Sequence, residues 1–373
     1  PWQAFFFAYI FGLKHKKSGL RVVRKILLCM AKKGGKSEIG GALGALLTFF
    51  DNENGAECYS AANKYDQAMF SWSAAKTIMR QLAKESEDIN SCLKVYDSIT
   101  TRSLIDTDSE SFFKPIAADS RTIDGVNPHF GLVDEYHEAK DDSIPANLES
   151  GMVAREQPML CIITTRGFNK HGVLGQLEQN YIAILRGQTE NDSVIPLIFA
   201  LDPEDDWQDK SDREKANPGI GRAPTWKGLE EEYKKALPEG AGREINFRTK
   251  NLNQWTDTSE TWVPDRIWKA NKGKTDLETM RGQKVYIGID LAVSRDISGY
   301  GKLFVPDDPK GVFRFVAKYY CPEEGAMERS RQDRVPYLDW ADKGLLTLTP
   351  VNITDYEIIE QDLLEDNCLY YIN

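Results

Sequence analysis

The sequence predicts an α/β protein with a mainly parallel sheet, followed by a second, mixed sheet. Apolar runs at residues 22–30, 129–133 and 159–165 are separated by helix-forming segments, which is typical of buried parallel strands. Polar residues follow each run, so we expect a ligand to bind at the carboxyl edge of the sheet. From Lys284 onward, three short strands separated by turn residues indicate a second domain built from hairpins.

The remaining elements support this division. An apolar segment opens the chain at residues 5–11, and we expect a helix of small residues at 40–47 to pack closely on the first strand. Residues 66–85 have the apolar spacing of an amphipathic helix. A stretch at 203–217 is rich in Asp, Glu and Lys, and a charged helix at 229–237 lies between turn-rich segments. This middle region predicts a lid and linker rather than another core.

The length and composition exclude several classes of protein. The chain has 373 residues, enough for two or three domains, and its 16 Phe, 15 Tyr and 8 Trp exclude disorder as the main state. No apolar run approaches the roughly 20 residues of a membrane span, so we expect a soluble protein with no membrane partner. The net charge of −10 excludes a uniformly basic protein, although a local basic stripe is enough to bind nucleic acid. The six cysteines and four histidines are scattered, which argues against a zinc site and favours a cytosolic protein with reduced thiols.

Residues 30–37, Met-Ala-Lys-Lys-Gly-Gly-Lys-Ser, match a P-loop except that Met30 replaces the first glycine. A P-loop needs backbone N–H groups that converge on phosphates at a helix N-terminus, a lysine for the terminal phosphates and a hydroxyl for Mg²⁺. These requirements are met by Gly34, Gly35, Lys36 and Ser37. A lysine-rich turn is the alternative. The buried strand before the loop and the small-residue helix after it favour nucleotide binding.

Two later strands carry the other groups that such a site needs. The run at 130–133 delivers Asp134 and Glu135 to the sheet edge, which is a Walker B arrangement. Asp134 would help to hold Mg²⁺, and Glu135 would orient or activate the attacking water. The alternative is a strand that ends in a solvated acidic turn. A third strand ends in Thr164 and Thr165, whose hydroxyls suit sensing of the γ-phosphate, although threonine pairs at strand ends are often structural.

The order of these motifs resembles that of the large terminase subunit of tailed bacteriophages and prophages. PWQ, GGKS, LVDE and ITT are followed by NP, LNQW and IGIDLA, and the resemblance covers residues 1–355. It implies an ASCE-type P-loop ATPase domain and a ribonuclease H-like nuclease domain. Such a subunit would translocate double-stranded DNA into a procapsid with ATP and Mg²⁺, and would cut concatemeric DNA as a metal-dependent endonuclease. The implied partners are double-stranded DNA, the portal protein, the small terminase subunit and further copies in a homo-oligomeric ring, in the host cytoplasm and transiently docked on the procapsid.

The resemblance also implies roles for single residues of the ATPase half. Gln3 would lie in the segment that recognises adenine, and Thr164 and Thr165 would couple hydrolysis to DNA movement. Lys32 or Lys33 occupies the place where many terminases carry an arginine near the phosphates. Lysine keeps the charge but lacks the planar guanidinium fork. We expect Lys32 to act in catalysis and Lys33 to contact the nucleotide.

An arginine supplied by a neighbouring subunit would complete such a site, and Arg155 and Arg166 are candidates for it.

In the nuclease half, residues 287–292, Ile-Gly-Ile-Asp-Leu-Ala, resemble the first strand of a ribonuclease H-like fold, with Asp290 as a metal ligand. Two Mg²⁺ or Mn²⁺ ions held by carboxylates would activate water and stabilise the leaving oxygen. Asp296 is a second candidate ligand, with a turn carboxylate as the alternative. The family pattern requires further acids after a later strand. Residues 369–372 resemble that strand, but Asn373 follows it, so we expect an incomplete nuclease site.

These observations predict three regions: an ATPase core at 1–200, a lid and linker at 201–283, and a nuclease domain at 284–373. Two other functions stay open. One is a helicase-like or repair ATPase without a packaging role, which the strand at 287–292 disfavours. The other is a scaffold that binds portal or capsid through the Trp-rich linker, which the intact P-loop and Walker B residues disfavour.

Overall fold

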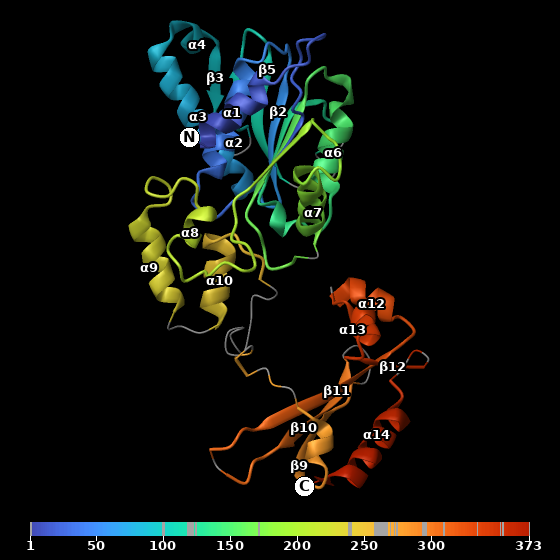
Figure 1. The fold of residues 1–373 in the computed structure, drawn as a ribbon. Helices are drawn as coiled ribbons and strands as arrows, with labels where there is room; N and C mark the ends of the chain where they lie inside the picture. The colour runs from blue at the N-terminus through green and yellow to red at the C-terminus, as the bar shows by residue number, and fades with distance from the viewer. Residues whose placement is uncertain are drawn as a thin grey trace. The chain divides into compact units, whose positions relative to one another are not determined.

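The computed structural model describes residues 2–98, 101–117, 123, 125–170, 172–237, 241–256, 268, 270–271, 273, 275–292, 297–308, 310–333, 335–350, 352 and 354–372. The chain divides into two compact units, residues 1–264 and 265–373 (Figure 1). Each unit has its own sheet and its own core, so each is described by itself.

The first unit contains an eight-stranded sheet in the order β3-β4-β5-β2-β6-β7-β1-β8. From β5 to β8 every neighbouring pair is parallel, and β3 and β4 extend the sheet with antiparallel pairs. The strands are β1 (Lys25–Cys29), β2 (Glu57–Ala62), β3 (Leu93–Tyr96), β4 (Ser103–Asp106), β5 (Ser111–Ala117), β6 (Pro128–Asp134), β7 (Met159–Thr164) and β8 (Val194–Ile198). The sheet confirms the mainly parallel α/β architecture that the apolar runs predicted.

Helices cover both faces of this sheet, which is why its central strands are continuous apolar runs. Side chains of β1 alternate between two cores: Ile26 and Leu28 pack with α1, α2 and α3, and Leu27 packs with α6 and α7 (Figure 1). The helices and 3₁₀ turns up to β8 are α1 (Trp2–Gly12), α2 (Lys36–Phe49), α3 (Tyr65–Glu85), α4 (Glu87–Cys92), η1 (Tyr136–Glu138), α6 (Ser143–Gly151), η2 (Met152–Ala154) and α7 (Val173–Leu185).

Helix α2 lies unusually close to its neighbours because it is rich in glycine. A Cβ atom added at Gly41 would lie 2.5 Å from the main-chain oxygen of Ser71 in α3, and one at Gly44 would lie 2.6 Å from the ring of Phe113 in β5. The run of small residues therefore positions the helix, and with it the loop at its N-terminus, against α3 and the sheet.

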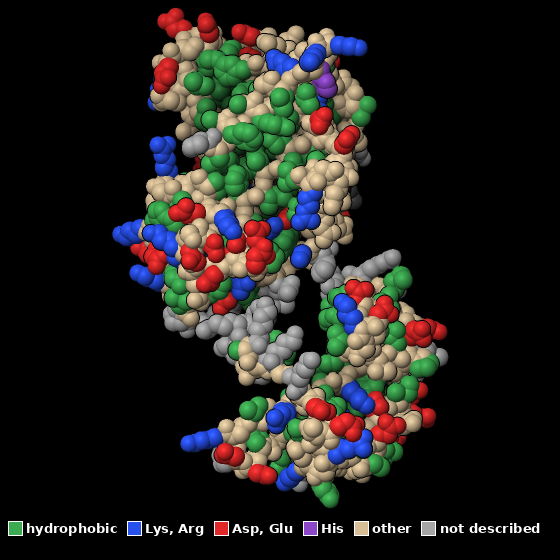
Figure 2. All heavy atoms as spheres, in the orientation of Figure 1, with side chains coloured by type: hydrophobic (Ala, Val, Ile, Leu, Met, Phe, Trp, Pro, Cys, Tyr) green, Lys and Arg blue, Asp and Glu red, His purple; other side chains and the backbone are tan. Residues whose placement is uncertain are grey.

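The apolar opening segment forms α1, an 11-residue helix whose Phe6 and Ile10 are buried in the core. Other side chains of this segment, including Phe5 and Tyr9, are exposed, and hydrophobic side chains gather over α1 in Figure 2. Across the described residues, no helix combines the length and the apolarity that crossing a lipid bilayer requires.

Residues 201–256, which we expected to belong to a lid and linker, have a small core within the first unit. Trp207, Tyr233 and Phe247 form a cluster of rings with centroids 5.7–6.1 Å apart. The same core includes Ala31 of the P-loop, so this region packs on the phosphate-binding loop itself. Acidic and basic side chains intermingle over α8 and α9 in Figure 2. The helices are α8 (Asp212–Lys215), α9 (Trp226–Ala236) and α10 (Ala241–Asn251).

The second unit has a five-stranded mixed sheet in the order β12-β11-β10-β9-β13. Strands β9, β10 and β11 pair antiparallel as hairpins, β12 pairs parallel with β11, and β13 pairs parallel with β9 on its other side. The elements are η3 (Leu277–Met280), β9 (Lys284–Asp290), β10 (Ser298–Phe304), β11 (Arg314–Pro322), α12 (Ala326–Asp333), α13 (Tyr337–Asp342), β12 (Thr347–Thr349), α14 (Tyr356–Leu369) and β13 (Tyr371–Ile372). This arrangement agrees with the ribonuclease H-like mixed α/β fold that the sequence predicted.

Helix α14 packs on one face of this sheet. Its Ile359 joins Tyr300 and Tyr320 in a core cluster. Beside them, the ammonium of Lys302 in β10 is buried against the carboxylate of Asp366 in α14, with Nζ 2.8 and 2.9 Å from the two carboxylate oxygens. A buried ion pair therefore connects the helix to the sheet.

Candidate nucleotide-binding site

The loop between β1 and α2 has the backbone of a phosphate-binding turn. Gly35 has a φ of +88°, a left-handed conformation that glycine adopts readily, and Lys33 has a φ of +63°. Gly35 precedes the first residue of α2, and no side chain caps the helix there. The N–H groups of the first turn of α2 are thus left for a ligand, and the helix dipole favours an anion at this end.

Lys36 begins α2, and its side chain is only 7% exposed. Its Nζ donates to the main-chain oxygens of Met30 at 2.9 Å and Ala31 at 3.0 Å, so the ammonium folds back over the loop. Burial lowers the pKa of Lys36, and the nearby carboxylates of Glu135 and Asp134 oppose that shift. The positive charge lies where the terminal phosphates of a nucleotide would bind.

Asp134 ends β6 at the same edge of the sheet. Ser37 Oγ lies 3.5 Å from Asp134 Oδ2, and the N–H of Glu135 donates to Asp134 Oδ1 at 2.8 Å. Burial raises the pKa of Asp134 to about 7, and the neighbouring charge of Glu135 adds to the rise. A buried carboxylate next to a second acid favours a bound cation, and hydroxyl and carboxylate oxygens are ligands that Mg²⁺ prefers. Ser37 and Asp134 therefore fit a magnesium ion.

Glu135 follows β6 in the left-handed region, with a φ of +52°, and its N–H donates to the main-chain oxygen of Ile163. This sparsely populated conformation turns the side chain into the cavity. Burial alone would raise the pKa of Glu135, but the hydrogen bond from His137 and the charges of His137, Lys36 and Lys32 hold that pKa below its usual value. The carboxylate is ionised at neutral pH, as a general base must be.

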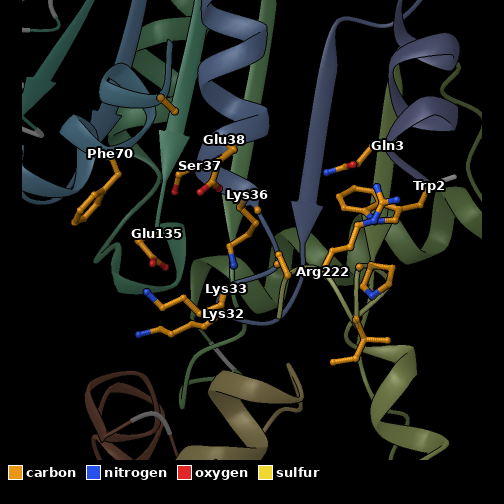
Figure 3. A pocket seen from close by; sticks show the side chains of 17 residues that line it. Trp2, Gln3, Lys32, Lys33, Lys36, Ser37, Glu38, Phe70, Glu135 and Arg222 are labelled. Carbon is orange, nitrogen blue, oxygen red and sulfur yellow. The ribbon is translucent and has the colours of Figure 1, made fainter. Parts of the chain in front are cut away.

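Lys36, Ser37 and Glu135 face one cavity of about 880 Å³, and Asp134 lies behind Ser37, outside the described lining. At one end, Lys32 and Lys33 extend toward Glu135, and at the other end Trp2, Gln3 and Arg222 lie together (Figure 3). The P-loop lies between the two ends. The lining residues are Trp2, Gln3, Lys32, Lys33, Gly34, Gly35, Lys36, Ser37, Glu38, Phe70, Ala74, Glu135, Pro218, Gly219, Ile220, Arg222 and Ala223. The structure thus brings Gln3 and the P-loop residues together in one site, as the sequence predicted.

The middle region adds groups to this site that sequence reasoning missed. Arg222 lines the base end, and Lys250 of α10 lies beside the phosphate end. The N–H of Lys32 donates to the main-chain oxygen of Lys250 at 2.8 Å. Burial and the charge of Lys32 both lower the pKa of Lys250. No local sequence motif identifies Arg222 or Lys250, because both residues reach the site only through the packing of residues 201–256 on the P-loop.

Thr164 and Thr165 are fully buried and do not line the cavity. Thr164 ends β7 and Thr165 follows it, and β7 lies between the P-loop strand β1 and the Walker B strand β6. Thr164 Oγ1 donates to the main-chain oxygen of Thr165 at 2.9 Å and accepts from the N–H of His137 at 3.1 Å. Both threonines contact His137, which follows Asp134 and Glu135 in the chain. His137 is a further residue that sequence reasoning missed.

Both candidate arginines are held within their own chain. Arg155 donates to Glu53 Oε1 at 2.9 Å and to the main-chain oxygen of Gly55 at 2.7 Å. Arg166 donates from Nε to Glu178 at 3.1 Å and from Nη1 to the main-chain oxygen of Asn253 at 3.1 Å. Sequence alone does not show these distant partners, and the assignment of either arginine to a neighbouring subunit's site stays a prediction.

In the second unit, Asp290 is exposed at the end of β9, opposite Gly299 of β10. Asp296 lies outside the described residues. Over the part of the chain that the structure describes, the one group of three metal-binding side chains is Cys92, Asp106 and Asp108 in the first unit. Of the two carboxylates that the sequence predicts as nuclease ligands, the described residues therefore include Asp290 alone, and no described group of three metal-binding side chains contains it.

The folds and the cavity define a P-loop ATPase unit joined to a ribonuclease H-like nuclease unit. Residues 1–183 match the family model "Terminase large subunit, ATPase domain", and residues 188–364 match "Terminase large subunit, endonuclease domain". The chain belongs to the large terminase subunit family.

Individual relatives agree. The chain is 30% identical over 246 residues to Protein YmfN of Escherichia coli (strain K12), covering 64% of this chain and 54% of that protein. It is 26% identical over 347 residues to the large terminase subunit of Enterobacteria phage HK97, covering 91% of this chain and 64% of the relative. The crystal structure of the HK97 bacteriophage large terminase shares the fold, with a TM-score of 0.58 at 22% identity, over 98% of this chain and 72% of that chain. The chain thus spans between half and two thirds of the length of these two curated relatives.

Proposed function

We propose that this chain is the motor subunit of a viral DNA-packaging machine. It would hydrolyse ATP to translocate double-stranded DNA into a procapsid, and its nuclease unit would cut concatemeric DNA. The observation that carries the proposal is the convergence of Lys36, Ser37, Glu135 and Gln3 on one cavity. That cavity lies in a chain whose two halves match the ATPase and endonuclease domains of one family.

The cavity suggests how the chain would act on ATP. The base would bind near Trp2 and Gln3, since an amide side chain both donates and accepts hydrogen bonds, as the edge of adenine requires. The phosphates would bind at the N-terminus of α2 and at Lys36. Bound Mg²⁺ would neutralise charge on the phosphates, and Ser37 and Asp134 would hold it. Glu135 would accept the proton of the attacking water.

The remaining roles in the ATPase half belong to the same proposal. Lys32 would stabilise charge that develops on the γ-phosphate, and Lys33 would contact the nucleotide. Both extend into the phosphate end of the cavity, which supports these roles (Figure 3). Thr164 and Thr165 would couple hydrolysis to DNA movement, a role that their place on the strand between β1 and β6 supports. The proposed regions are the ATPase core at 1–200 and the lid and linker at 201–283.

For the nuclease domain at 284–373, Asp290 and Asp296 are proposed ligands of Mg²⁺ or Mn²⁺. The proposed partners are double-stranded DNA, the portal protein, the small terminase subunit and further copies of this chain in a ring. The proposed location is the host cytoplasm, with transient docking on the procapsid. Family membership supports these assignments.

ATP hydrolysis with and without double-stranded DNA tests the proposal. We expect DNA to stimulate hydrolysis, and Lys36→Ala or Glu135→Gln to abolish it. Lys84→Ala, near the C-terminal end of α3 and outside the cavity lining, is the matched control and should hydrolyse at the native rate. Hydrolysis by Lys36→Ala at the native rate would show that the P-loop assignment is wrong.

A further inference from the structure

His137 lies where the Walker B segment meets the end of strand β7. It belongs to η1, the 3₁₀ turn after β6, and its side chain is 13% exposed. Its ring atom Nδ1 is 3.2 Å from Glu135 Oε2, 3.3 Å from Thr164 Oγ1 and 3.5 Å from Thr165 Oγ1. One ring nitrogen therefore lies within reach of the proposed general base and of both threonines.

The hydrogen-bond partners assign the hydrogen to Nδ1. The hydroxyl of Thr164 already donates to the main-chain oxygen of Thr165, so toward His137 it acts as an acceptor. The carboxylate of Glu135 is ionised and can only accept. The contact with Thr164 consequently needs a donor on the ring, and Nδ1–H provides it, while the same nitrogen lies at ion-pair distance from Glu135 Oε2. The other ring nitrogen, Nε2, lies 4.0 Å from Glu138 Oε1.

The surroundings hold the ring in this orientation. The backbone N–H of His137 donates to Thr164 Oγ1 at 3.1 Å, which connects the turn to β7 independently of the ring. A Cβ atom added at Gly167 would lie 3.2 Å from Cβ of His137, so the segment after β7 packs directly against it. The described residues that line the cavity include Glu135 and do not include His137. His137 therefore acts on a bound nucleotide only through Glu135.

We propose that His137 is a positioning residue that links the carboxylate of Glu135 to the hydroxyls of Thr164 and Thr165 through its Nδ1–H. The proposal rests on the proposed ATPase function. A rearrangement of the threonines would move the ring of His137 and so change its contact with Glu135. A movement of Glu135 would in turn change the contacts of the ring with the two threonine hydroxyls. The histidine thus makes the rate of hydrolysis depend on the state of the coupling strand.

Steady-state ATP hydrolysis by the full chain, with and without double-stranded DNA, tests this inference in three variants. His137→Ala removes the donor. His137→Asn places an amide N–H near the position of Nδ1, and His137→Gln places one near the position of Nε2. His15→Ala, an exposed histidine in the segment after α1, is the matched control. Nucleotide affinity and thermal unfolding are measured for every variant.

We expect His137→Ala and His137→Gln to lower kcat by roughly 10- to 100-fold, the range expected when a catalytic group is displaced by up to an ångström. KM and nucleotide affinity should change by less than about twofold, and the stimulation by DNA should fall. His137→Asn should restore kcat to within about threefold of the native value and should restore the stimulation.

An unchanged kcat in His137→Ala would overturn the inference. An equal loss of kcat in His137→Asn and His137→Gln, with both variants folded, would also overturn it, because that result would assign His137 a packing role only. A native chain that neither binds nor hydrolyses ATP would instead refute the proposed function. If His137→Ala fails to fold, the contrast between the Asn and Gln variants decides the question.

Discussion

The buried ion pair between Lys302 and Asp366 predicts how the second unit responds to the loss of one charge. The side chains are 2% and 6% exposed, and Asp366 also accepts from the hydroxyl of Tyr300 at 2.6 Å. Asp366→Ala would leave the ammonium of Lys302 buried without a counter-ion, and breaking such a pair costs about 3–5 kcal/mol. An entire domain is stable by only about 5–15 kcal/mol, so the loss is large.

Hydrogen exchange of β10 in the full chain measures this change within the second unit alone. Each 1.4 kcal/mol is tenfold in an equilibrium constant. The exchange rate of amides in residues 298–304 should therefore rise by roughly 100- to 4,000-fold in Asp366→Ala. Glu278→Ala is the control in the same unit, because it breaks an exposed pair with Arg281 whose side chains are 72% and 56% exposed. Exposed pairs contribute about 0–1 kcal/mol, so exchange should rise by fivefold or less.

A second arm separates the charge from the packing. Lys302→Met combined with Asp366→Leu removes both charges, and such replacements are often neutral or stabilising. The double variant should therefore exchange more slowly than Asp366→Ala. If Asp366→Ala raised exchange by less than about tenfold, or if the double variant exchanged as fast as the single one, the reasoning from an uncompensated buried charge would be refuted.

Two further predictions concern the metal sites. Because burial raises the pKa of Asp134 to about 7, the carboxyl is roughly one tenth ionised at pH 6 and nine tenths ionised at pH 8. Calorimetric titration with Mg²⁺ alone should therefore give about tenfold tighter binding at pH 8, and Asp134→Asn should remove this pH dependence. An equal Mg²⁺ affinity at the two pH values would contradict the burial argument. Asp290→Asn should lower cleavage of supercoiled plasmid in Mg²⁺ or Mn²⁺ relative to the native chain, and equal cleavage by both would exclude Asp290 as a ligand.

The strand–loop–helix unit around the P-loop was predictable because its signals are local. A buried strand, two glycines and a lysine are consecutive in the chain, and no distant contact is needed to define Lys36 or Ser37. The pairing of Asp134 with Ser37 also followed, since parallel strands end at the same edge. Register confirms this arrangement: Cys29 pairs with Thr164, and Asp134 pairs with Ile163.

The residues that sequence reasoning missed depend on packing between distant segments. Lys250 reaches the loop only because α10 packs beside Lys32, and Arg222 does so through the segment that follows α8. The partners of Arg166 include Asn253, 87 residues away along the chain. His137 is close to Glu135 in sequence, but its significance depends on hydroxyls supplied by another strand. Apolar periodicity carries no information about such pairings.

The contacts of Lys36 with its own loop have a consequence for repeated turnover. Its ammonium bonds to the oxygens of Met30 and Ala31, so contacts within the chain itself hold the shape of the loop. Binding would then exchange one set of partners for another and would not have to order a flexible segment, which removes a major entropic penalty. After product release, the same two carbonyl oxygens would again be available to the lysine. The loop would thus return to the same conformation after each cycle, which suits a protein that hydrolyses one nucleotide after another.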